Sequence, residues 1–257
     1  MKLYILGTCS GTEPQPDRKH TSFVVEAGGG LYWFDAGEGC SYTAHTMGLD
    51  LLNVRSIFIS HTHMDHVGGL GNLLWNIRKL SKVRKDLPKE KKIRLFIPCL
   101  ATWEGFKQVL ENTEGGFACD FEVEAEPIKG GTVFQNEDIK VTAFPNQHIK
   151  TEADSPPRSF SYVIESEGKT VVFSGDVRSI EELNEIVSAG CDALLLETGH
   201  HKVEDCCLWA KNKPIHKLLF VHHGREILAD SEACLAVAQG ILGQKTDICH
   251  DRQEIQL

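Results

Sequence analysis

Four residues that can bind a metal ion lie within six consecutive positions of the chain. His61, His63, Asp65 and His66 belong to the segment HTHMDH, which follows the apolar run SIFIS at residues 56–60. Imidazole nitrogens combined with a carboxylate oxygen suit Zn²⁺, Mn²⁺ or Fe²⁺. Polar residues at the carboxyl end of a strand face the crevice in which open α/β sheets bind ligands. The segment therefore predicts a metal centre at the end of a strand.

The spacing within this segment divides the ligands into two sets. The His-x-His pair, His61 and His63, can point both imidazoles the same way from an extended loop. Asp65 and His66 begin the next turn and can face a second metal ion. Gly68 and Gly69 then allow the chain to approach the site closely before a helix starts.

Short runs rich in Val, Ile, Phe and Tyr, separated by Gly, Asn and Pro, predict the strands that position this segment. The expected strands are residues 2–6, 22–27, 31–35, 56–60, 94–98, 139–144, 160–165, 170–174, 193–197 and 218–221. Helical periodicity and one capping box at Ser179 predict helices over residues 73–83, 103–110, 179–187, 204–210 and 230–241. Strands and helices alternate in both halves of the chain, which predicts two sheets with helices packed outside them.

Length and composition place the chain among ordinary globular proteins. It has 257 residues, 41% hydrophobic and 25% charged, without a repeat or a linker, so we expect a single domain over residues 1–257. No apolar run reaches the ~20 residues of a membrane span, and the N-terminus reads as a strand and turn. Nine cysteines are scattered without CxxC spacing, which suits free thiols in a reducing cytoplasm.

The balance of charge argues against general nucleic-acid binding. The formal net charge is −9, whereas affinity for long nucleic acid rests on neutralising phosphates. One segment, residues 78–94, carries nine Lys or Arg against two acids. It is either a solvated helix end and loop or a rim that attracts phosphate near the active site.

The pattern HTHMDH matches the HxHxDH signature of metallo-β-lactamase-fold hydrolases. The segments LGTCSGTEP, WFDAGEG, PPRSFSYVIE and FSGDVR resemble the ribonuclease Z branch of that superfamily. The resemblance implies an α/β fold of the αββα four-layer type, in which two mixed sheets carry helices on their outer faces. Its first motif is specific for the fold and only weakly specific for the substrate.

The resemblance also implies three further ligands, which the sequence supplies in order. They are His148 in AFPNQH, Asp176 in SGDVR and His222 in VHHGRE, with His223 as the alternative to His222. In the family pattern one metal is held by His61, His63 and His148 and the other by Asp65, His66 and His222, with Asp176 as the bridge. Two divalent ions, zinc in the first place and Mn or Fe otherwise, can share a water and make a bridging hydroxide that acts as the nucleophile.

The same family places a further histidine in a GH segment shortly before the last ligand. Gly199 and His200 match it, with His201 as the neighbouring alternative, so Asp65 and His200 are the expected catalytic residues. Members that process tRNA carry a long basic arm between the fourth histidine and the bridging aspartate. Here Asp176 follows His148 by 28 positions, which leaves no room for such an arm. The resemblance and this departure together predict a phosphodiesterase that acts on a small or short phosphodiester, with tRNA disfavoured as a substrate, and the free cysteines predict a cytoplasmic location.

Two other functions stay open at this level. An ester, thioester or lactone hydrolase would use the same metals, because the bridging hydroxide can also attack a carbonyl carbon. A metal-binding scaffold or sensor without catalysis is disfavoured because every expected ligand is present. The expected partner is the phosphodiester substrate, with no membrane partner, and a homodimer is left open.

Overall fold

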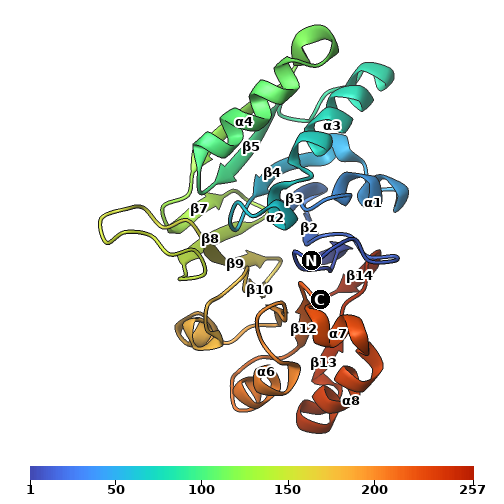
Figure 1. Cartoon of the computed structure of the whole chain (residues 1–257). Coiled ribbons are helices and arrows are strands. Elements are labelled where there is room, and N and C mark those ends of the chain that lie inside the picture. The colour runs from blue at the N-terminus through green and yellow to red at the C-terminus, as the bar shows by residue number, and fades with distance from the viewer.

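Two seven-stranded sheets form the centre of the molecule, which is described here from a computed structural model (Figure 1). The structure describes the backbone of residues 1–257 and every side chain except that of Glu114. The first sheet has the order β14-β1-β2-β3-β4-β5-β6 and the second the order β13-β12-β11-β10-β9-β8-β7. Helices cover the outer face of each sheet, as the αββα architecture requires.

The first sheet begins as an antiparallel meander and continues as a parallel sheet. Strands β1 to β3 pair antiparallel, β3 to β6 pair parallel, and β14 pairs antiparallel with β1. Gly28 and Gly29 turn the β2–β3 hairpin with φ of 55° and 73°, the left-handed values that glycine adopts without strain. The strands are β1 (Lys2–Gly7), β2 (Ser22–Ala27), β3 (Gly30–Phe34), β4 (Val54–Phe58), β5 (Lys92–Ile97), β6 (Glu122–Pro127) and β14 (Gln253–Gln256).

The second sheet is antiparallel from β7 to β10 and parallel from β10 to β13. Strands β8, β10, β11 and β12 therefore run in the same direction and end at the same edge of the sheet. The strands are β7 (Gly131–Gln135), β8 (Lys140–Pro145), β9 (Phe160–Ser166), β10 (Lys169–Phe173), β11 (Ala193–Glu197), β12 (Leu218–Val221) and β13 (Thr246–Ile248).

The helices belong to two outer layers. Helices α1 (Cys40–Thr46), α3 (Leu70–Arg84) and α4 (Leu100–Glu111) pack on the first sheet, and α6 (Val203–Ala210), α7 (Arg225–Ala229) and α8 (Ser231–Leu242) pack on the second. The shorter helices are α2 (Met64–Val67), α5 (Asn184–Val187), η1 (Leu51–Asn53), η2 (Glu114–Phe117), η3 (Ile180–Leu183) and η4 (Gly243–Lys245). No helix among the described residues combines the length and hydropathy that a bilayer crossing needs.

The main core lies between the two sheets. Its central aromatic rings come from both of them: Phe34 and Phe58 of the first sheet contact Tyr162 of the second in edge-on geometry. Two further apolar clusters fill the spaces between each sheet and its helices. Burying apolar side chains on both faces of each sheet explains why most strands read as nearly continuous apolar runs.

The sequence located most of these elements. All ten expected strands and all five expected helices overlap observed ones, and the capping box at Ser179 is present. Four strands were not expected, namely β6, β7, β13 and β14. Each of the four lies at or next to the edge of its sheet, where side chains stay partly exposed and the apolar signal is weak. All nine cysteines are free thiols, as expected.

Candidate metal centre

Five of the seven predicted metal ligands follow the carboxyl end of a strand. His61 and His63 follow β4, His148 follows β8, Asp176 follows β10 and His222 follows β12. Because these strands end at one side of the sandwich, residues more than 150 positions apart in the sequence come within hydrogen-bond distance, as His222 and Asp65 do. Asp65 and His66 reach the same place from the short helix α2.

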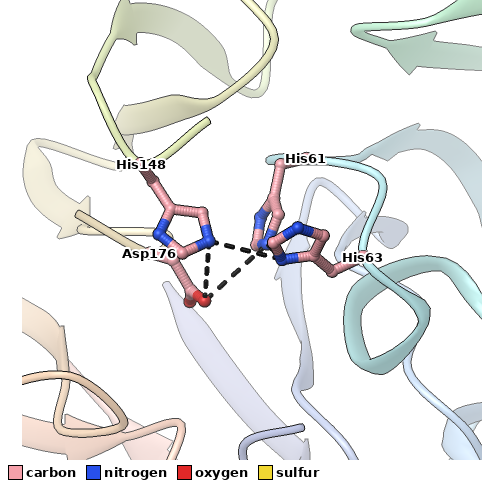
Figure 2. A group of neighbouring side chains, drawn as sticks. All are labelled: His61, His63, His148 and Asp176. Carbon is pink, nitrogen blue, oxygen red and sulfur yellow. Dashed lines mark hydrogen bonds and ion pairs between the residues drawn. The ribbon is translucent and has the colours of Figure 1, made fainter. Parts of the chain in front are cut away.

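Three imidazoles and one carboxylate converge in the first group of ligand atoms (Figure 2). His61 Nε2 lies 3.1 Å from His63 Nδ1, and His148 Nε2 lies 3.3 Å from the same atom. Asp176 Oδ2 completes the group, 3.7 Å from His61 Nε2 and 3.6 Å from His148 Nε2. Four donors bound to one tetrahedral zinc ion at ~2.0–2.1 Å would lie about 3.3 Å apart, so these separations fit a zinc ion.

The second group consists of Asp65, His66 and His222, all buried. His222 Nε2 lies 3.1 Å from Asp65 Oδ2, and His66 Nε2 lies 3.4 Å from that oxygen. Asp176 also contacts this group, with Oδ1 3.3 Å from His66 Nε2 and Oδ2 3.4 Å from His222 Nε2. Asp176 therefore lies between the two groups, where a bridging carboxylate would be needed.

The hydrogen bonding of these buried atoms tests whether a cation fits. His66 Nε2 and Asp176 Oδ1 are both buried, and neither makes a hydrogen bond. Leaving a buried polar atom unpaired costs about 1–3 kcal/mol, so native structures rarely do it without a partner such as an ion. The donors are imidazole nitrogens and carboxylate oxygens, which borderline divalent cations accept. The residues present fit two divalent ions.

Two buried acidic residues, to which the sequence assigned no role, orient the ligand side chains through hydrogen bonds. Asp35, at the end of β3, accepts hydrogen bonds from His66 Nδ1 at 2.7 Å and from Ser60 N and Oγ at 2.6 and 2.8 Å. Ser60 Oγ in turn lies 3.1 Å from His61 Nδ1. These bonds leave Nε2 of both histidines facing the centre, as such outer contacts do in metal sites. The sequence did contain a signal for Asp35, because it is an acidic residue at the end of an otherwise apolar strand in the segment WFDAG.

Glu197, at the end of β11, is the other acid that the sequence left unassigned. It is fully buried and accepts hydrogen bonds from the backbone N and the Nδ1 of His200 at 3.0 Å each, through Oε2 and Oε1. Its Oε2 also lies 3.5 Å from His222 Nδ1. A further group of donor atoms, Asp176, Glu197, His200 and His222, lies close enough together to hold an ion, so His200 has the position of either a proton donor or a ligand.

The structure distinguishes the neighbouring histidines by their contacts. His222 reaches Asp65 and Asp176, whereas His223 points away from the cluster. His223 Nε2 donates to Phe220 O at 3.0 Å, and its Nδ1 accepts from Arg18 Nη1 at 2.7 Å. His201 Nε2 similarly donates to Val177 O at 3.1 Å.

Opposite charges within the cluster shift the pKa values of its buried acids and of His222 toward the charged forms. Burial favours the neutral acid, but the nearby rings of His222 and His66 hold the pKa of Asp176 well below its usual value. Burial alone would lower the pKa of His222, yet Asp176 and Asp65 raise it to about 9. The pKa of Glu197 falls to about 2 against the effect of burial, through its bonds with His200 and His222. Burial lowers the pKa of His223 to about 3, so this ring is neutral.

A cavity of about 320 Å³ opens directly onto the ligands. Asp65, Asp176, His200 and His222 line it. The loop Ser10–Thr12 forms another part of its wall, and Gly11 lies so close to Asp65 that an added Cβ would be 3.1 Å from the carboxylate. The cavity has room for a small ligand that reaches both groups of donors.

The basic segment at residues 78–94 lies at the end of the first sheet away from the ligand loop, and three of its charged side chains are paired with acids. Arg84 pairs with Asp50, Lys92 with Glu124 and Arg94 with Glu126. The segment includes the carboxyl end of α3 and the amino end of β5, and the parallel strand β4 carries the ligand loop at its opposite, carboxyl end. Of the two interpretations of this segment, the structure supports a solvated helix end and loop.

Comparisons with known proteins agree with this architecture. The family described as anti-Pycsar protein Apyc1 matches residues 1–218. Ribonuclease Z of Methanothermobacter thermautotrophicus is 29% identical over 150 residues, which cover 58% of this chain and 45% of that protein. The chain thus spans less than half the length of this curated relative.

Two solved structures share the fold over nearly their whole length. Human tRNase Z, short form, covers 100% of this chain and 99% of its own, with a TM-score of 0.74 and 19% identity. The metallo-β-lactamase fold protein YhfI from Bacillus subtilis covers 99% of each chain, with a TM-score of 0.75 and 13% identity. The predicted αββα metallo-β-lactamase fold and the resemblance to ribonuclease Z are confirmed.

Proposed function

We propose that this chain, which belongs to the family of the anti-Pycsar protein Apyc1, is a dinuclear metal-dependent phosphodiesterase that hydrolyses a small or short phosphodiester. The observation that carries the proposal is the convergence of seven side chains on one point. Five imidazoles and two carboxylates from four separate segments direct their ligand atoms into two groups, and Asp176 contacts both. Five of the seven side chains are buried and some of their donor atoms make no hydrogen bond, which a packing role does not explain.

The ligands divide between two ions in the way their contacts suggest. His61, His63 and His148 would hold one ion, Asp65, His66 and His222 would hold the other, and Asp176, which contacts both groups, would be shared. When bound, two zinc, manganese or iron ions would supply a shared hydroxide as the nucleophile and neutralise charge on the phosphate. Zinc is the first choice because histidine-rich sites with a carboxylate suit it best.

The protein's own residues orient the reactants and handle the proton. Asp65 lines the cavity and orients His222 through the 3.1 Å contact. Glu197 binds Nδ1 of His200, which leaves Nε2 as the nitrogen that exchanges a proton with the substrate. The side chain of His200 is 45% exposed at the cavity, a position from which it can protonate a leaving oxygen.

The size of the cavity and the charge of the chain favour a small substrate over tRNA. Between His148 and Asp176, where the tRNA-processing members of the resembled family carry an arm, the chain has room only for a loop and the strands β9 and β10. The cavity measures about 320 Å³, and the chain carries a net charge of −9. These features support a short phosphodiester, which needs no extended basic surface.

Metal analysis together with a substrate panel tests the proposal. Protein purified without chelator should contain close to two equivalents of metal. It should hydrolyse bis(p-nitrophenyl) phosphate and a dinucleotide in preference to p-nitrophenyl acetate and a lactone. Preference for the carbonyl substrates would favour the ester or lactone hydrolase, and two bound ions without any turnover would favour a metal-binding sensor. Trace metal that added zinc does not restore would refute the metal centre itself.

A further inference from the structure

The backbone of His222 adopts a conformation that its residue type disfavours. Its φ is 48°, in the left-handed region where a side chain with a Cβ is rarely found. The residue follows β12 directly and is 2% exposed. The left-handed conformation turns the imidazole toward Asp65 and Asp176, so something in the surroundings must hold the backbone there.

His223 supplies that restraint through both its ring and its backbone. Ring Nε2 donates to Phe220 O at 3.0 Å and so closes the turn that contains His222. The backbone N donates to Thr8 O at 2.6 Å, and the backbone O accepts from Ser10 N at 3.2 Å and from Ser10 Oγ at 2.8 Å. The same residue thus fixes the turn before it and the Ser10–Thr12 loop, which lines the cavity.

Arg18 determines which ring nitrogen of His223 carries the proton. Its Nη1 lies 2.7 Å from His223 Nδ1, and a guanidinium can only donate. Nδ1 must therefore accept, and the ring proton must be on Nε2, where the bond to Phe220 O requires it. A second bond, from Arg18 Nη1 to Thr8 Oγ1 at 3.2 Å, ties the guanidinium to the same loop.

We propose that Arg18 and His223 are positioning residues that together hold His222 in its ligating conformation and fix the Ser10–Thr12 wall against it. Arg18 fixes the tautomer of the His223 ring, and this tautomer makes the hydrogen bond that closes the turn. The closed turn then directs the imidazole of His222 toward the metal centre. The inference rests on the proposed function for the two metal ions, but it does not depend on the substrate.

Binding of each ion, measured by competition with a chromophoric zinc chelator, tests the proposal. Arg18→Met keeps the aliphatic stem and removes every donor. We expect it to weaken one of the two zinc ions about 10–100-fold, the range for outer contacts of metal ligands, and to leave the other unchanged. His223→Gln, which can both donate and accept, should stay closer to the wild type than His223→Leu.

Arg225→Met is the matched control. Arg225 also joins this part of the chain to the loop, through a bidentate pair with Glu13, but its side chain is 68% exposed and does not contact His223. We expect both zinc affinities of this variant to lie within about twofold of the wild type, because exposed ion pairs contribute little.

Two-bond ¹H–¹⁵N spectra of the histidine rings in the metal-free protein give an independent measurement. His223 should show the Nε2–H tautomer in the wild type and a mixture of tautomers in Arg18→Met. Wild-type affinity for both ions in Arg18→Met would overturn the proposal, as would equal weakening of both ions with a lower melting temperature of the metal-free protein. A wild type that binds fewer than two ions would overturn the metal centre as well, whereas absent phosphodiesterase activity alone would leave the binding result intact.

Discussion

Truncation of His200 separates phosphodiesters with a poor leaving group from phosphodiesters with a good one. Expelling an alkoxide from phosphorus requires a proton, whereas p-nitrophenolate leaves without one because its conjugate acid is much stronger than an alcohol. The ring of His200 is held by Glu197 at 3.0 Å and lines the cavity, so it is placed to supply that proton. His200→Ala should therefore damage the two reactions unequally.

The expected size of the effect follows from the role of the ring. A positioned general acid contributes about 10²–10⁴-fold, which is ~3–5 kcal/mol of transition-state free energy. We expect kcat/KM of His200→Ala to fall by that factor on a dinucleotide and by less than about tenfold on bis(p-nitrophenyl) phosphate. Metal content should stay at the wild-type value, since His200 is not counted among the seven ligands.

Steady-state kinetics on both substrates, combined with elemental analysis, gives the result. His201→Ala is the control, because that ring donates to Val177 O and does not line the cavity. Equal losses on the two substrates would refute the role as proton donor and leave charge stabilisation in its place. Loss of one metal equivalent would instead make His200 a ligand, in agreement with the alternative group of donors that includes Glu197 and His222.

Three further predictions test the metal centre. Asp176→Ala should lower total metal content more than His148→Ala does, because Asp176 contacts both groups of donors, and loss of one equivalent in both variants would show that it is not the bridge. Asp35→Asn should weaken zinc binding about 10–100-fold in a chelator competition, since the amide cannot accept all three hydrogen bonds that the carboxylate accepts; unchanged affinity would deny it an orienting role. Gly199→Ala would place a Cβ 2.5 Å from the ring of His222, and we expect a loss of about 1–3 kcal/mol in unfolding free energy with one ion weakened, which a thermal melt with and without metal would detect.

The local sequence was enough to predict the fold and the first part of the site. HTHMDH is contiguous, and its position after an apolar strand already implied ligands at the end of a sheet. The buried strands were visible because packing on both faces makes them almost wholly apolar. Strand β6 shows where this signal fails: its glutamates alternate with small or apolar residues and pair with Lys92 and Arg94 on the neighbouring strand. Such a segment forms a strand because its side chains pair with those of the neighbouring strand, which the local sequence does not reveal.

Only the tertiary structure decided which residues orient the ligands through hydrogen bonds and which of two adjacent histidines faces the metal centre. Asp35 and Glu197 act on residues that lie 31 and 25 positions away, in His66 and His222, and no spacing in the sequence marks those pairs. Arg18 and His223 are 205 positions apart. His222 and His223 are the same residue type in consecutive positions, so composition and spacing cannot rank them. Their directions depend on one left-handed backbone angle, which is held by hydrogen bonds to a distant loop and therefore exists only once the chain has folded.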